Sequence, residues 1–392
     1  MLIVARVPQA IGGSALLALG MMIALSAFPA DRRGKAMAWF GVPSMIAPAA
    51  GPIVGGYLMS IASWHAAFLI NVPIGVVGIM MAVAFLRHSR TQSADTTTFD
   101  IVGFLLIGAA SAGVTLGVSE SAIVGRGSLL TQGCLVLGAL LMVGFIFWNL
   151  ISSRDGIETI VDLRLFRHRS FWSGAIALSV IIFAMFGPLL LVPLYLQSTR
   201  GVGVFQAGLI MTWNALASVV AAFIGGRLVD RFGGRAVVLP GIAIFATDTL
   251  LFTGLSLSTP LSVVAALLFL RGIGSGLTTQ PLIAASLREV TKGAETAHAS
   301  TLTGMLRNLV GGTGVAVLAT YVQVRAGVYA TVLSHHGFAQ ALVATTSLTH
   351  AIDDAFWLSF VLLCVAGVII LLILPGKESS EQRSHSAKEE YT

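Results

Sequence analysis

Long runs of apolar residues follow one another along the whole chain, and short polar segments separate them. A transmembrane helix needs roughly 20 mostly apolar residues, because each residue adds about 1.5 Å toward a hydrocarbon layer about 30 Å thick. The pattern predicts eleven such helices. They are expected over residues 2–28, 35–60, 66–86, 100–118, 129–151, 171–196, 205–226, 236–257, 260–286, 297–322 and 353–374. The fold class that follows is an all-α polytopic membrane protein.

The composition supports this class. Of the 392 residues, 56% are hydrophobic and only 10% are charged, whereas a soluble domain carries roughly 25% charged residues. These values exclude an ordinary soluble enzyme, a disordered chain and a disulfide scaffold. A formal net charge of +6 would suggest nucleic acid as the partner of a soluble protein. Here the basic residues lie mostly in the loops between apolar runs, where they set membrane topology, so we expect a lipid bilayer and no nucleic acid.

The distribution of Lys and Arg predicts the orientation. One set of alternate loops carries 17 of these residues, and the opposite loops carry only Arg126, Arg200 and Arg325. Because basic loops stay on the cytoplasmic side, we expect a multi-pass protein of the inner (plasma) membrane with a cytoplasmic C-terminus. Eleven spans then place Met1 on the outer side with no polar segment before the first span. This arrangement favours a chain that lacks its first helices, through a mis-set start or a real truncation.

Two of the predicted spans contain an arginine that is followed by Ile-Gly and small residues. They are the segments from Arg6 to Ser14 and from Arg271 to Gly276, and each span ends in a charged cytoplasmic turn. The similarity indicates two homologous halves, as in many transporters. A chance similarity between two glycine-rich helices is the alternative.

Several short motifs make the chain similar to a known family. They are Arg6 with Gln9, Gly12 and Gly13; Gly51-Pro52-Ile53-Val54-Gly55-Gly56; Trp64 with the segment from Phe68 to Gly75; Pro193-Leu194-Tyr195-Leu196-Gln197 with Gly201 and Gln206-Ala207-Gly208; and the segment from Gly226 to Arg235. Together they resemble the major facilitator superfamily, specifically the fourteen-helix drug:proton antiporters (EmrB/QacA type). Two departures, Ala10 and Ala47 in place of usual glycines, keep a small side chain.

The resemblance implies that the eleven spans are helices four to fourteen of that family. Residues 1–90 would be the remainder of the N-terminal half, and residues 91–170 would hold two extra helices and a cytoplasmic linker. Residues 171–374 would form the C-terminal six-helix half, and residues 375–392 a disordered cytoplasmic tail.

The resemblance also implies a function. Such a protein exports amphiphilic drugs or related small molecules in exchange for protons by alternating access, and its partners are the substrate, protons and the bilayer. We expect no enzymatic activity, no metal and no cofactor beyond the proton gradient, and a periplasmic adaptor is unassigned. An inactive fragment of such a transporter and an exporter of one specific metabolite are the alternatives.

Three residues are candidates for proton coupling. Asp248 is the acidic residue near the middle of a span, and a carboxyl group held in an apolar interior can bind and release protons near neutral pH. Its alternative role is a hydrogen bond to Thr247, to Thr249 or to an adjacent helix. Arg6 and Gln9 lie on one helical face and would tune a nearby carboxylate, unless Arg6 extends to the membrane surface.

Two glycine-rich motifs are candidates for conformational change. Gly51, Pro52, Gly55 and Gly56 give smooth helical faces that suit either an outer gate or plain close packing. Gly226, Asp230, Arg231, Gly233 and Arg235 are expected in a tight cytoplasmic turn that acts as a latch, or only as a topology signal.

Polar and aromatic residues inside spans are candidates for a substrate cavity. They are Arg307, Asn308, Asn214, Trp213 and Gln280, and a structural hydrogen-bond clasp is the alternative for Arg307 and Asn308. The segment 323–352 is expected to be a long outer loop, and its histidines lack the spacing of metal ligands.

Overall fold

The structure is a computed structural model. It describes residues 2–29, 32–61, 65–85, 100–123, 128–154, 159, 165–166, 169–256, 258–287, 293–335 and 340–373. The expected tail over residues 375–392 lies outside the described residues. The first helices are α1 (Leu2–Ser26), α2 (Arg33–Ile61), α3 (Ala66–Leu69), α4 (Asn71–Phe85), α5 (Ile101–Ile123) and α6 (Leu129–Arg154). They are followed by α7 (Arg169–Leu194), the π-helical turn η3 (Tyr195–Thr199), α8 (Val204–Phe232), α9 (Gly234–Phe252), α10 (Leu261–Ser286), α11 (Gly293–His335) and α12 (Gln340–Ile373).

Each predicted span coincides with a helix, and α3 and α4 share the third one. Among the described residues, eight helices are long and apolar enough to cross a membrane, and α4 is a shorter apolar helix. No strand occurs in the described part of the chain. The all-helical, polytopic fold class is therefore confirmed.

The expected long outer loop over residues 323–352 is wrong. Helix α11 continues to His335, and α12 already begins at Gln340. The apolar run that predicts a membrane span ends near residue 322. Among the residues that follow, Gly327 is the one with a markedly low helix propensity, so the helix continues. Helix α11 has 43 residues, so it is about 65 Å long. It is about twice as long as the hydrocarbon layer is thick, and it extends beyond that layer.

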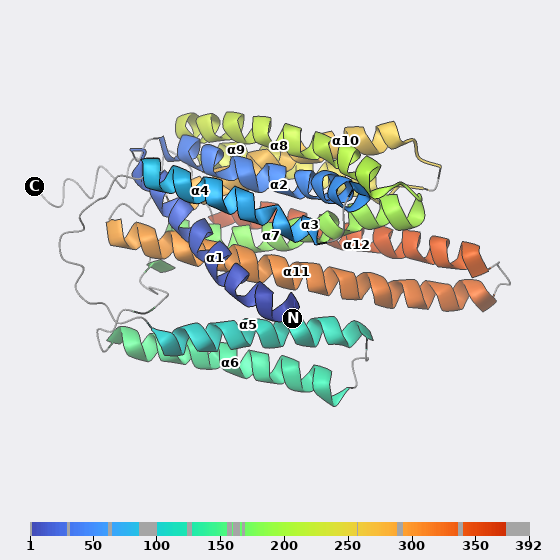
Figure 1. Ribbon diagram of the computed structural model, residues 1–392, viewed down its shortest axis with the longest axis horizontal. Coiled ribbons are helices and arrows are strands. Elements are labelled where there is room, and N and C mark those ends of the chain that lie inside the picture. Colours follow the sequence, from blue (N-terminus) through green and yellow to red (C-terminus); the bar gives the residue numbers. More distant parts are fainter. Residues whose placement is uncertain are drawn as a thin grey trace, which may run out of the picture.

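Helices α7 to α12 form one packed bundle. Helix α10 packs against α7, α8 and α9, and α12 packs against α7, α9 and α11. From the N-terminal part, α2 packs against α8 and α10, and α1 packs against α11. The α5–α6 hairpin contacts the bundle at α11 and lies along one edge of the molecule (Figure 1).

The backbones of α8 and α10 are in direct contact. A side chain at Gly272 would collide with the backbone oxygen of Asn214, and one at Gly276 would collide with that of Ser218. Small residues permit such close approach between membrane helices. Ser218 and Ser275 share a hydrogen bond of 2.9 Å across the same interface. This contact fixes the two helices that supply most polar groups of the cavity described below.

Candidate functional site

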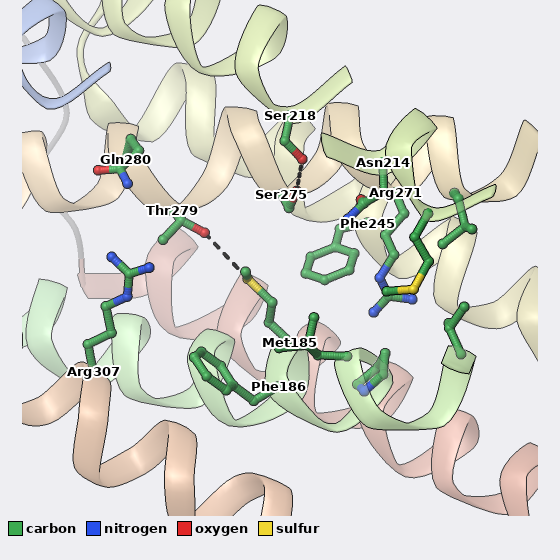
Figure 2. Close-up of a pocket in the computed structure, with 15 residues that line it drawn as sticks. Met185, Phe186, Asn214, Ser218, Phe245, Arg271, Ser275, Thr279, Gln280 and Arg307 are labelled. Atoms are coloured by element: carbon green, nitrogen blue, oxygen red, sulfur yellow. Dashed lines mark hydrogen bonds between the residues drawn. The ribbon is translucent and has the colours of Figure 1, made fainter. Parts of the chain in front are cut away.

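A cavity of about 100 Å³ lies inside the C-terminal bundle, between α7, α8, α9, α10 and α11. Its walls are largely apolar, with Met185, Phe186, Leu189, Val192, Met211 and Leu268 among the lining residues. The polar groups that line it are Asn214, Ser218, Arg271, Ser275, Thr279, Gln280 and Arg307. Figure 2 shows Arg307 at one end and Arg271 toward the other, with Met185 and Phe186 between them. An apolar chamber with a few placed polar groups is the usual form of a small-molecule site.

A buried ion pair lies next to this cavity. Asp248 of α9 is fully buried, and Arg271 of α10 is 6% exposed. The Nη1 atom of Arg271 lies 3.5 Å from Oδ2 of Asp248. The guanidinium carbon of Arg271 also lies 4.9 Å from the centre of the Phe245 ring. Arg271 lines the cavity whereas Asp248 does not, so the guanidinium group faces both the carboxylate and the cavity.

The pair leaves polar atoms without partners. Asp248 Oδ1 and Arg271 Nη2 are buried without a hydrogen bond among the described residues, and the same is true of Asn214 Oδ1 and Gln280 Oε1. A buried polar atom that lacks a partner costs roughly 1–3 kcal/mol. Three of these four residues line the cavity. The site is therefore suited to a ligand or to a rearrangement that supplies the missing bonds.

The neighbouring threonines do not satisfy Asp248. The hydroxyl group of Thr247 donates to the carbonyl oxygen of Ala243, and that of Thr249 donates to the carbonyl oxygen of Phe245. Of the alternatives that the sequence left for Asp248, the structure shows the contact with an adjacent helix. This contact does not decide whether Asp248 carries protons, which stays a prediction.

Three of the five predicted cavity residues line the cavity, namely Arg307, Asn214 and Gln280. Trp213 is 51% exposed, and Asn308 is exposed on α11; neither belongs to the lining. A role of these two residues in substrate binding stays a prediction, because the sequence does not show which face of a span a polar or aromatic residue occupies.

Gln280 also connects the cavity to the N-terminal part. A side chain at Gly41 of α2 would collide with the side chain of Gln280 on α10. The edge of the Trp39 ring of α2 packs against Phe223 of α8, with 4.9 Å between the ring centres. The two parts of the molecule therefore meet directly behind one wall of the cavity.

Arg6 and Gln9 lie away from the cavity. Arg6 Nη1 donates a hydrogen bond of 2.7 Å to Gln9 Oε1, and both side chains are exposed on α1. The Arg6 guanidinium lies 4.8 Å from the centre of the Phe68 ring. The structure thus brings the two predicted partners together, but it does not bring them to Asp248.

The expected gate residues lie in the middle of α2. Gly51 is exposed and Gly55 is half-buried. Apart from the backbone of α2 itself and the adjoining residues, no described atom lies within 4 Å of the position that a Cβ atom would take at either glycine. For Pro52 and Gly56 the structure describes only the helical backbone. A role of these four residues in gating stays a prediction.

The expected latch motif lies at the junction of α8 and α9 and is helical except for Gly233, and its role as a latch stays a prediction. Gly226, Asp230 and Arg231 belong to the end of α8, and Arg235 belongs to the first turn of α9. The connection is the single residue Gly233, with φ of 88°. Only glycine adopts such a φ without strain, so this one residue sets the angle between the two helices. The Arg231 guanidinium lies 5.2 Å from the centre of the Phe232 ring.

Arg271 is the functional candidate that the sequence analysis missed. The sequence marks it only as part of the repeat, in the position that Arg6 takes in the first span. A charged residue inside a membrane helix faces a cavity or a partner because exposure to lipid is costly. This signal was present in the sequence, but the pairing with Asp248 required the packing of α9 against α10.

The described helices form an apolar bundle around a cavity, and a buried ion pair lies beside that cavity. Residues 1–315 match the family model described as Major Facilitator Superfamily, and the chain belongs to this superfamily. It is a multi-pass membrane protein of a transporter superfamily.

Curated relatives agree with this assignment. The chain is 28% identical over 319 residues to the uncharacterized MFS-type transporter YhcA of Bacillus subtilis, covering 81% of this chain and 59% of that protein. It is 25% identical over 377 residues to the lincomycin resistance protein LmrB of Listeria monocytogenes, covering 96% and 78%. It is 29% identical over 329 residues to the multidrug resistance protein B homolog of Mycobacterium tuberculosis, covering 82% and 59%. The chain thus spans about three fifths of the length of two of these relatives.

Proposed function

We propose that the protein exports amphiphilic drugs or related small molecules in exchange for protons. The observation that carries this proposal is the Asp248–Arg271 pair beside an apolar cavity. Family membership supports transport, and the resistance proteins among the relatives support drug export. The cavity supplies the site for the substrate, and Asp248 supplies a group that can carry a proton.

The ion pair couples proton binding to substrate binding, because the bound proton and the bound substrate exclude each other. When Asp248 is ionised, it attracts Arg271 and holds the guanidinium group at the wall of the cavity. When Asp248 is protonated, that attraction is lost and Arg271 becomes free to turn. Asn214 Oδ1 is an unpaired acceptor in the same wall, and Figure 2 shows Asn214 beside Arg271. In the protonated state, Arg271 bonds to Asn214 and occupies space that the substrate needs.

Mutual exclusion of proton and substrate is what an exchange of the two across a membrane requires. A transporter that binds either a proton or a substrate, and reorients with one of them, moves the two in opposite directions. Reorientation takes place by rocking of the N-terminal part against the C-terminal bundle. The contact between Gly41 and Gln280 gives this motion a direct connection to the cavity. The cytoplasmic loops and the C-terminus lie on the inner face of the plasma membrane, as the distribution of basic residues indicates.

The test is a proton-movement assay in inside-out membrane vesicles that contain the full chain. A pH-sensitive dye reports the gradient, and a candidate drug is added. Export coupled to protons dissipates the gradient when the drug is present, and vesicles with the Asp248→Asn variant keep it. A drug-independent signal, or no signal for any drug tested, contradicts the proposal and favours an inactive form of the transporter.

A further inference from the structure

The charges of the cavity are unbalanced. Its lining contains two guanidinium groups, Arg271 and Arg307, and no carboxylate. Asp248 neutralises Arg271 from behind. Arg307 has no hydrogen bond or ion pair within the part of the chain that the structure describes. The lining of the chamber therefore carries about one positive charge that no described residue compensates.

An uncompensated cation inside a membrane bundle is costly. A buried charge normally pairs with an opposite charge or faces water. Arg307 instead borders an apolar chamber, and Met185 and Phe186 lie between it and Arg271 (Figure 2). A guanidinium group presents several donors in a fixed plane, and this geometry matches the two oxygens of a carboxylate, sulfonate or phosphate group.

A second group at the same end of the cavity also lacks a partner. Gln280 is 2% exposed and lines the cavity, and its Oε1 atom has no donor among the described residues. Figure 2 shows Gln280 across from Arg307, at the end opposite to Arg271. An acidic head group with a neighbouring hydroxyl or amide donor would pair with both residues.

We infer that the substrate is an amphiphilic anion whose acidic head group binds Arg307. Its apolar body lies along Met185 and Phe186 toward Arg271. This inference rests on the proposed transport function and specifies its substrate class. Because Arg307 holds the head group, the substrate does not draw Arg271 away from Asp248. The exclusion between proton and substrate is therefore retained.

The test is equilibrium binding to the full chain in detergent, without any pH gradient. Three probes share a naphthalene body and differ in the head group: 1-naphthaleneacetate is an anion, 2-(1-naphthyl)ethanol is neutral, and 2-(1-naphthyl)ethylammonium is a cation. The anion is expected to bind more tightly than the other two by about tenfold, the effect of one charge-assisted hydrogen bond. Equal or tighter binding of the cation overturns the inference.

Variants of Arg307 locate the effect. Arg307→Gln should weaken binding of the anion by about tenfold and leave the neutral probe unchanged. Arg307→Lys keeps the charge and should keep the preference for the anion. Arg325→Gln is the matched control, because it removes the same charge from the same helix outside the cavity, and it should change no affinity. Equal weakening of all three probes by Arg307→Gln would indicate a structural role and overturn the inference.

A second measurement separates this inference from the proposed function. The same probes are added to proteoliposomes with an imposed pH gradient. If the anion binds through Arg307 but the gradient moves no probe, proton-coupled transport fails while the inferred site stands. If the gradient moves the cation and not the anion, transport stands and the inferred substrate class fails.

Discussion

Two arginine–aspartate pairs within the described residues differ in almost every respect. Arg271 and Asp248 are buried beside the cavity and approach each other only to 3.5 Å. Arg325 and Asp354 form the outer pair, so called because neither residue lines the cavity. They join α11 to α12, and Arg325 Nε donates to Asp354 Oδ2 at 2.6 Å. Tyr329 completes the outer cluster, because its hydroxyl group donates to the same carboxylate oxygen at 2.8 Å.

The inner pair is suited to a change of conformation, whereas the outer pair is suited to holding two helices together. The outer cluster uses three side chains in short hydrogen bonds and is partly open to solvent. The inner pair has one long contact and leaves an atom of each partner unsatisfied. Protonation of Asp248 would therefore break little hydrogen bonding and would free Arg271.

The largest expected effect is that of Asp248→Asn on transport. Asparagine keeps the size of the side chain but cannot ionise, so Arg271 is no longer held by a charge. Flux driven by a pH gradient should fall by about 5- to 150-fold, the range of typical coupling free energies. The measurement is gradient-driven uptake into proteoliposomes, with wild-type and variant at equal protein content. Unchanged flux would remove Asp248 from the coupling mechanism.

The next effect concerns stability and distinguishes an ion pair from two independent residues. Arg271→Gln leaves the carboxylate of Asp248 buried without its partner, and this should lower the free energy of unfolding by about 3–5 kcal/mol. The double variant with Asp248→Asn should recover most of that loss. Thermal unfolding in detergent measures both. Additive losses would show that the two side chains do not interact.

The outer pair should give a smaller effect. Arg325→Gln removes a contact between partly exposed groups, and such pairs contribute little to stability. The free energy of unfolding should fall by a small fraction of the fall in Arg271→Gln, and gradient-driven flux should be unchanged. A loss of proton coupling in Arg325→Gln would contradict the assignment of coupling to the inner pair alone.

Tyr329→Phe is expected to have the smallest effect. It removes one hydroxyl group from the outer cluster while Arg325 and Asp354 keep their direct contact. The unfolding temperature should fall less than in Arg325→Gln, and substrate affinity should not change. A larger fall than in Arg325→Gln would mean that the hydroxyl group, not the ion pair, joins α11 to α12.

The sequence predicted the helices well because a membrane helix must be apolar over its whole length. The same signal failed beyond Val322, because a helix can continue in water after its apolar stretch ends. It also indicated Asp248, Arg307, Asn214 and Gln280 as unusual polar groups inside spans. It did not pair Asp248 with Arg271 or exclude Trp213 and Asn308 from the cavity, because these facts depend on how α8 to α11 face one another. The packing of the helices, rather than the periodicity of the sequence, determines which side chains meet and which line the cavity.

The most direct test of the central claim measures protons when substrate binds. The full chain is kept in weakly buffered detergent near neutral pH with a pH-sensitive dye, and a ligand that binds in the Arg307 experiment is added at matched pH. If proton and substrate exclude each other through Asp248, binding releases protons, up to one per chain, and Asp248→Asn releases none. Uptake of protons, or release that persists in Asp248→Asn, would contradict the account.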